Sequence, residues 1–168
     1  MFDWLIDALC WVWEQLRGPR LRLELPFVPG EPEQHILPIV QDNRWRIVFG
    51  LAIRNEGRRE ARNWRVRLVT TSGATTIALD QQRDGRTVTQ KIAGSGWQYE
   101  VHAASPSDTV PPGMAVVILG RNTLNFPSRL DLVLVRCWIA AAGVPGREDT
   151  LWLEPDWTKM TARFSWRR

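Results

Sequence analysis

Residues 44–54, Arg-Trp-Arg-Ile-Val-Phe-Gly-Leu-Ala-Ile-Arg, alternate between large apolar side chains and smaller or charged ones. The large apolar positions share one side of an extended chain: Trp45, Ile47, Phe49, Leu51 and Ile53. Alternation over this length predicts a β-strand with one face in a core. Asn55-Glu56-Gly57 interrupts the pattern, and a second strand at 62–70 places Trp64, Val66 and Leu68 inward. The rest of the chain is therefore expected to pack around two consecutive strands.

Similar runs, separated by turn residues, continue in both directions from this pair. Further strands are predicted at 21–25, 97–101, 114–119, 130–139 and 150–154. After Asp131, the strand at 130–139 is apolar on both faces except at Arg136, so it should be central in its sheet. With about eight or nine strands and no alternation with helices, the sequence predicts an all-β sandwich, with a small barrel as the alternative.

Three segments between these strands carry less regular patterns. Residues 74–92 predict a hairpin about the turn Asp84-Gly85, with Ile77 opposite Ile92. Residues 29–43 contain prolines and predict a connection in which 36–40 covers the edge of the core. The last dozen residues are expected to add an edge strand or to form a loose tail.

The N-terminal segment predicts an amphipathic helix over 1–18, followed by a β-sandwich domain over 20–168. Its apolar face comprises Phe2, Leu5, Ile6, Leu9, Val12, Trp13 and Leu16, and Asp3, Asp7 and Glu14 lie opposite. Gly18-Pro19 ends the helix. The run is too short for a membrane span and lacks the basic start of a signal peptide. This favours a cytoplasmic or peripheral-membrane location over secretion.

Three roles are open for this helix. Its apolar face could pack on the rest of the chain or on a second copy. The helix could lie in a membrane interface, with Trp4 and Trp11 at headgroup depth. It could also dock on another protein.

Composition and motifs argue against several functional classes. The chain is 44% hydrophobic and 24% charged, with a formal net charge of +4 and acidic residues throughout, which disfavours nucleic acid as a partner. Cys10, Cys137, His35 and His102 are too scattered for a metal site. Gly94-Ser95-Gly96 lacks the spacing of a nucleophile elbow, and glycine-rich phosphate loops are missing. We therefore expect no enzyme activity, no cofactor and no metal.

Tryptophan supplies the candidate binding residues, since the chain has ten tryptophans and Trp and Arg are favoured at interface hot spots. Trp45, Trp64 and Trp97 are in phase with aliphatic neighbours, so the core is their expected place. The candidates for a partner or a membrane are Trp4, Leu9, Trp11, Trp13, Trp152, Trp157 and Trp166. A protein partner or self-association is the leading hypothesis, with a membrane surface, or a glycan at Trp152 or Trp157, as alternatives.

A family resemblance supports the same layout. The strand 47–53, followed by Asn55-Glu56-Gly57 and the segment 61–68, resembles the opening of bacterial Ig-like sandwiches related to cell-adhesion domains. Pro111-Pro112-Gly113 before an apolar strand is similar to a later step in the same domains. The layout also resembles bacterial proteins of unassigned function that join one N-terminal hydrophobic helix to such a sandwich. The resemblance implies an Ig-like fold over about 20–154 and a non-catalytic binding role.

Overall fold

The computed structural model describes Ile6 and residues 18–26, 36–72, 74–79, 88–93 and 96–167. These ranges consist of β-strands joined by turns and loops, which confirms the predicted all-β class. The helix predicted over 1–18 lies outside the described residues except for Ile6 and Gly18. No described segment forms a helix long and apolar enough to cross a membrane.

The described residues form eleven strands. They are β1 (Leu21–Glu24), β2 (Ile36–Gln41), β3 (Trp45–Asn55), β4 (Arg65–Thr70), β5 (Thr76–Ala78), β6 (Val88–Ala93), β7 (Gly96–His102), β8 (Ala115–Phe126), β9 (Val133–Ala141), β10 (Val144–Asp156) and β11 (Thr161–Arg167).

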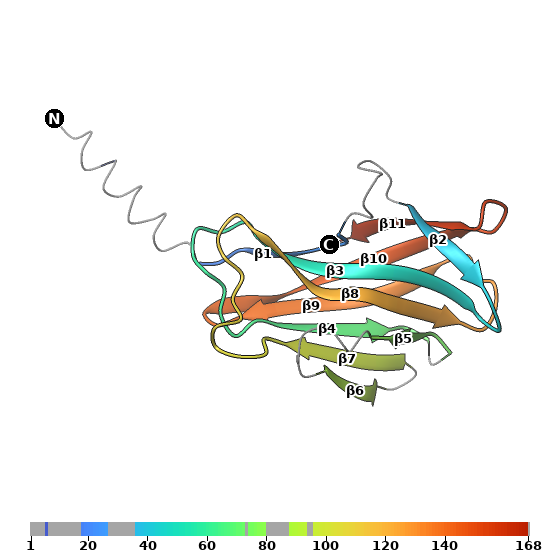
Figure 1. Cartoon of the computed structure of the whole chain (residues 1–168), viewed down its shortest axis with the longest axis horizontal. Helices are drawn as coiled ribbons and strands as arrows, with labels where there is room; N and C mark the ends of the chain where they lie inside the picture. Colours follow the sequence, from blue (N-terminus) through green and yellow to red (C-terminus); the bar gives the residue numbers. More distant parts are fainter. Residues whose placement is uncertain are drawn as a thin grey trace.

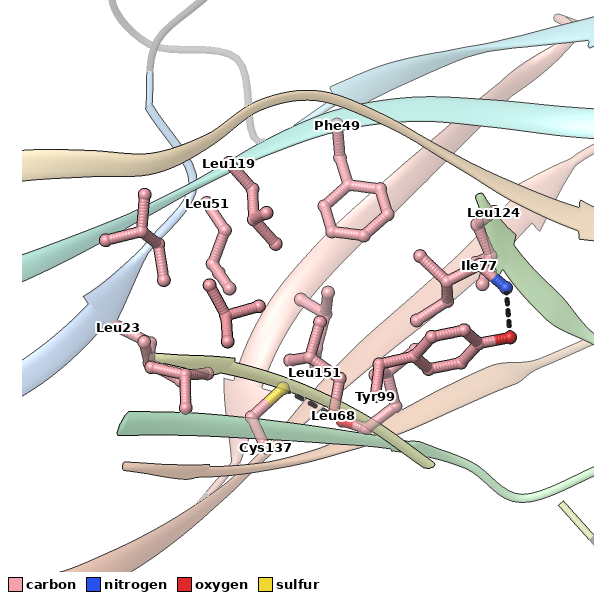
Figure 2. Close-up of a cluster of buried hydrophobic side chains, with 14 of the residues drawn as sticks. Leu23, Phe49, Leu51, Leu68, Ile77, Tyr99, Leu119, Leu124, Cys137 and Leu151 are labelled. Atoms are coloured by element: carbon pink, nitrogen blue, oxygen red, sulfur yellow. Dashed lines mark hydrogen bonds between the residues drawn. The ribbon is translucent and has the colours of Figure 1, made fainter. Parts of the chain in front are cut away.

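The strands belong to one antiparallel, nearly closed sheet (Figure 1). The order is β5-β8-β3-β2-β11-β10-β9-β4-β7-β6, and β1 pairs with β3 in addition. A short pairing of β2 with β11, from Arg163↔Ile36 to Thr161↔Pro38, joins the half that contains β3 and β8 to the half that contains β9 and β10. Side chains from the two halves meet between them (Figure 2).

The core contains the two strands from which the sequence pattern was read. Ile47, Phe49, Leu51 and Ile53 of β3 are buried, as are Trp64 and, on β4, Val66 and Leu68, whereas Trp45 is half-buried. Figure 2 shows Phe49 and Leu51 pointing toward Leu68, Cys137 and Leu151. Burial of each large aliphatic or aromatic side chain contributes roughly 1.5–3 kcal/mol relative to its exposure. The phase predicted for both strands is confirmed.

A tyrosine hydroxyl joins the two ends of the sheet. Tyr99 of β7 is buried, and its hydroxyl oxygen accepts a hydrogen bond of 2.9 Å from the backbone N–H of Ile77 in β5 (Figure 2). β5 pairs with β8, whereas β7 pairs with β4 and β6. The side chain therefore links β5, at one end of the strand order, to β7, which is next to the last strand at the other end.

The Asn55-Glu56-Gly57 interruption forms a hydrogen-bonded corner at the end of β3. Asn55 is fully buried, and its Oδ1 accepts from the N–H groups of Gly57 (2.9 Å) and Arg20 (3.2 Å). Its Nδ2 donates to the carbonyl oxygens of Arg59 (2.6 Å) and Val110 (2.9 Å). A Cβ on Gly57 would lie within 3 Å of the backbone of residues 18–20, so only glycine fits against that segment without a shift. One amide thus satisfies four backbone groups.

The predicted hairpin over 74–92 is wrong. Ile77 of β5 pairs with Leu124 of β8, and Ile92 of β6 pairs with Trp97 of β7. Asp84-Gly85 lies outside the described residues. The turn signal is local, whereas Ile77 becomes buried only beside the distant strand β8 and gives its N–H to Tyr99.

Three other expectations are corrected by the strand bounds. The segment predicted as a connection contains β2, whose Leu37 and Ile39 are buried. β8 continues past residue 119 to Phe126, and its pairing with β3 shifts register on either side of Leu51. β11 pairs with both β10 and β2, so the C-terminal segment is an integral strand and not a loose tail.

Candidate interaction face

The outer side of β4, β9, β10 and β11 displays tryptophan and arginine side chains together. Neighbouring residues in these strands, such as Leu68, Cys137 and Leu151, are buried in the core. Side chains alternate along a strand, so the residues between them point outward. We call this surface the tryptophan–arginine face, and it comprises Arg67, Arg136, Trp138, Trp152 and Arg167.

The first pair on this face is Arg67 and Trp138. They are directly opposite in the β4–β9 register, and the guanidinium carbon of Arg67 lies 5.2 Å from the centre of the Trp138 ring. A Cβ on Gly146 of β10 would overlap the same indole, so the missing side chain provides the space that Trp138 occupies. The Nε of Arg67 is buried and has no hydrogen-bond acceptor among the described residues.

The second pair is Trp152 and Arg167. The guanidinium carbon of Arg167 lies 3.5 Å from the centre of the Trp152 ring, and a guanidinium nitrogen lies 3.8 Å from a carboxylate oxygen of Glu154. Trp152 is half-buried and is flanked in the sheet by Leu134 and Ser165. Stacking of this kind stabilises by about 0.5–2 kcal/mol, depending on desolvation.

Positive charge exceeds negative charge on this side of the sheet. The described arginines there are Arg65, Arg67, Arg136, Arg163 and Arg167, and the acidic residues are Glu100, Glu148, Glu154 and Asp156. The side chains of Arg65, Arg136 and Arg163 are exposed, and none of them has an ion pair or hydrogen bond with a described residue. Glu100 lies 3.9 Å from His102 Nε2.

The candidate tryptophans that the structure describes, Trp152, Trp157 and Trp166, lie in different places. Trp152 lies on the tryptophan–arginine face, as its phase predicts, while Trp4, Leu9, Trp11 and Trp13 lie outside the described residues. Trp166 pairs with Leu151 and is partly buried against the core.

Trp157 belongs to a separate cluster at the end of the sheet where β3 begins and β8 ends. Its ring lies 4.9 Å from that of Trp45 and 6.0 Å from that of Phe126, both edge-on, and its Nε1 donates to the Leu130 carbonyl at 3.1 Å. The Arg129 guanidinium lies over both indoles, at 5.3 Å from Trp45 and 5.7 Å from Trp157. Because of these contacts, we interpret Trp157 as a residue that packs its loop against the end of the sheet.

Burial favours the neutral forms of Cys137 and Tyr99 in the core. Burial raises the pKa of the Cys137 thiol far above its ordinary value, and the nearby Asp149 carboxylate raises it further. Burial also raises the pKa of the Tyr99 hydroxyl. Within the described residues, no group of three or more His, Cys, Asp or Glu side chains could hold a metal ion.

Trp138 and Arg67 were not among the residues singled out from the sequence. Because the run 130–139 is largely apolar on both faces, hydropathy alone does not show on which face Trp138 lies. After Asp131, Arg136 is the only charged residue of that run, and its face includes every second residue, hence Leu134 and Trp138. The alternation set by Arg136 is therefore the sequence signal that places Trp138 on the outer side of the sheet.

A scan of the chain against protein-family models finds no match, and a search among curated proteins finds none either.

Proposed function

We propose that the protein is a non-catalytic interaction module that binds a protein partner through the tryptophan–arginine face. The supporting observation is the display of Trp138 and Trp152 on the outer side of the sheet, each in contact with an arginine, above a core filled by other side chains. Tryptophan and arginine dominate the energetics of protein–protein interfaces. Their positions on regular strands keep such a surface rigid, which lowers the entropy lost on binding.

We also infer an Ig-like β-sandwich as the finer description of the fold. The two sequence motifs that carry the resemblance lie together in space: the Gly113 N–H donates to the Asn55 carbonyl at 2.8 Å, and Asn55 Nδ2 donates to the Val110 carbonyl. Ala61 and Val110 form an isolated bridge beside them. This meeting of segments far apart in sequence supports a shared layout, and domains of that type are binding modules.

Affinity capture with matched variants tests the proposed function. The full chain is immobilised, exposed to a lysate of its host cells, and the retained proteins are quantified by mass spectrometry. We expect the Trp138→Ala/Trp152→Ala double variant to lose the specific partner, because hot-spot truncation costs about 2 kcal/mol or more per residue. Val40→Ala is the control, since Val40 is an exposed apolar residue on β2, in the other half of the sheet.

Thermal unfolding of each variant shows whether it is folded before capture is compared. Equal retention of the same partner by the folded double variant and by the unsubstituted protein would refute the proposed site.

A further inference from the structure

The tryptophan–arginine face carries guanidinium groups that form no ion pair with the described residues of the chain. Arg65, Arg136 and Arg163 have no ion pair with a described residue, and Arg67 contacts Trp138 without one. Resting on the proposed function, we propose that the partner is recognised through an acidic, extended segment that lies across this face. The complementary group on the partner is the carboxylate of aspartate or glutamate.

Two of the guanidinium groups are held in place before any partner arrives. Arg67 and Arg167 lie over the rings of Trp138 and Trp152. A guanidinium that lies over an aromatic ring can still donate hydrogen bonds in its own plane, where a carboxylate can accept two of them. One nitrogen of Arg167 already lies 3.8 Å from a carboxylate oxygen of Glu154. Because the rotamers are restricted by stacking, less side-chain entropy is lost when such a pair forms.

The strand order sets the length of the segment that fits. β4, β9, β10 and β11 are consecutive neighbours, so Arg67 and Arg167 lie three inter-strand steps apart, or about 15 Å. Arg136 of β9 lies between them, exposed, in the row that also contains Thr150 and Arg167. An extended chain rises about 3.3 Å per residue, so four or five residues cover this distance. Trp138 and Trp152 provide apolar surface between the charged positions.

The same face disfavours a polyphosphate backbone. Glu148 and Glu154 are exposed on β10, in the middle of the face, where they would repel an unbroken line of phosphates. One side of the Trp152 ring is covered by Arg167 and is closed to a stacked base. A protein segment avoids both problems, because its carboxylates can be placed opposite the arginines and its neutral residues opposite the glutamates.

Fluorescence anisotropy tests the inference with a labelled deca-glutamate peptide and the full chain. Labelled deca-lysine and a ten-nucleotide oligothymidylate are the comparison probes. We expect the glutamate peptide to bind at low ionic strength and to weaken at least about tenfold when salt reaches 0.3 M, since exposed charges are screened. Arg136→Gln should weaken binding about two- to fivefold, as the loss of one exposed ion pair. Arg136 is exposed and has no ion pair with a described residue, so this variant should fold normally.

Arg44→Gln is the matched control, because it removes the same charge from the turn before β3 in the other half of the sheet. Absence of glutamate-peptide binding, or equal weakening by Arg44→Gln and Arg136→Gln, overturns the inference. Tighter binding of the oligothymidylate with the same dependence on Arg136 overturns it in favour of nucleic acid. If partner capture depends on Trp138 and Trp152 but not on Arg136, the proposed function stands and the acidic segment does not.

Discussion

Replacement of Asn55 by alanine should destabilise the protein by about 3–4 kcal/mol. Asn55 lies at the end of β3 and does not belong to the tryptophan–arginine face. The substitution removes four hydrogen bonds, to Arg20, Gly57, Arg59 and Val110. A typical net contribution is about 0.5–1.5 kcal/mol per bond, and an unsatisfied buried group costs about 1–3 kcal/mol. In the variant, water can replace Asn55 as the partner at the three partly buried bonds, whereas the bond to Val110 is buried. The expected loss of stability is therefore smaller than the largest value obtained by adding the four contributions.

Urea unfolding followed by tryptophan fluorescence measures this loss. With a slope of about 2 kcal/mol per molar urea, the midpoint should fall by about 1.5–2 M at unchanged slope. Asn125→Ala is the control, because within the described part of the chain its side chain makes one hydrogen bond, partly buried and 3.3 Å long, to the Thr123 carbonyl. Its loss should cost no more than about 1 kcal/mol.

A second substitution examines the donor side of the same amide. Asn55→Asp keeps the acceptor for Arg20 and Gly57 but places an oxygen against the carbonyls of Arg59 and Val110. Burial and these carbonyls should raise the pKa of the introduced carboxyl, and its protonated form can donate one bond. The penalty should therefore grow as pH rises from about 4 to 7. If Asn55→Ala and Asn125→Ala shift the midpoint equally, the corner does not contribute as argued.

Three further predictions concern the Tyr99–Ile77 hydrogen bond, the core and the tryptophan–arginine face. Tyr99 is the only tyrosine in the sequence, so absorbance at 295 nm should report its ionisation, with a midpoint above pH 10.0. The free energy of unfolding should fall as pH exceeds about 10, because the unfolded phenol loses its proton there while the folded one keeps it. Tyr99→Phe should remove this pH dependence, cost about 1–2 kcal/mol of stability at pH 7 and speed hydrogen exchange at the Ile77 amide. Unchanged exchange at that amide would contradict the hydrogen bond between Ile77 and Tyr99. In a Cys10→Ser background, Cys137 should react with an aromatic disulfide reagent at least about a thousandfold more slowly than in urea-unfolded protein, since it is buried and its thiol pKa is raised; fast reaction of the native protein would disprove its burial. Gly146→Ala should displace the Trp138 indole, change the near-ultraviolet circular dichroism and cost about 1–3 kcal/mol, while Gly18→Ala, whose new methyl group meets open space, should change stability by less than about 0.5 kcal/mol; equal effects would show that the indole has room to spare.

The inward phases of β3 and β4 could be predicted because each strand has a simple two-residue period, and only a one-sided core produces it. The same reasoning placed Trp152 outward and β9 in the centre of its sheet, between β4 and β10. Pairing partners were harder. Nothing local in β5 shows that Ile77 joins Leu124 of β8, because the choice depends on burial that exists only after the sheet has curved.

The candidate site was predicted only in part, for a related reason. Trp152 was found by phase, but its contact with Arg167 depends on β11 folding back along β10. Trp138 was assigned to an apolar strand because a large aromatic on an outer face has the same hydropathy as one in a core. The discriminating feature was the neighbour Arg136, since charge marks the solvent side of a strand more reliably than apolarity marks the core side.

The corner at Asn55 also determines how the domain would carry mechanical load. The segment 18–20 is tied to it through Arg20, whose carbonyl accepts from the Glu56 N–H at 2.8 Å, and β1 follows directly, paired along β3 from Leu21↔Asn55 to Glu24↔Ala52. A pull on the N-terminus along this axis stretches the bonds between β1 and β3 together, in shear, and does not open them one at a time. Extraction of β1 is then a single cooperative step, and the lifetime of the domain under tension is set by the barrier to that step.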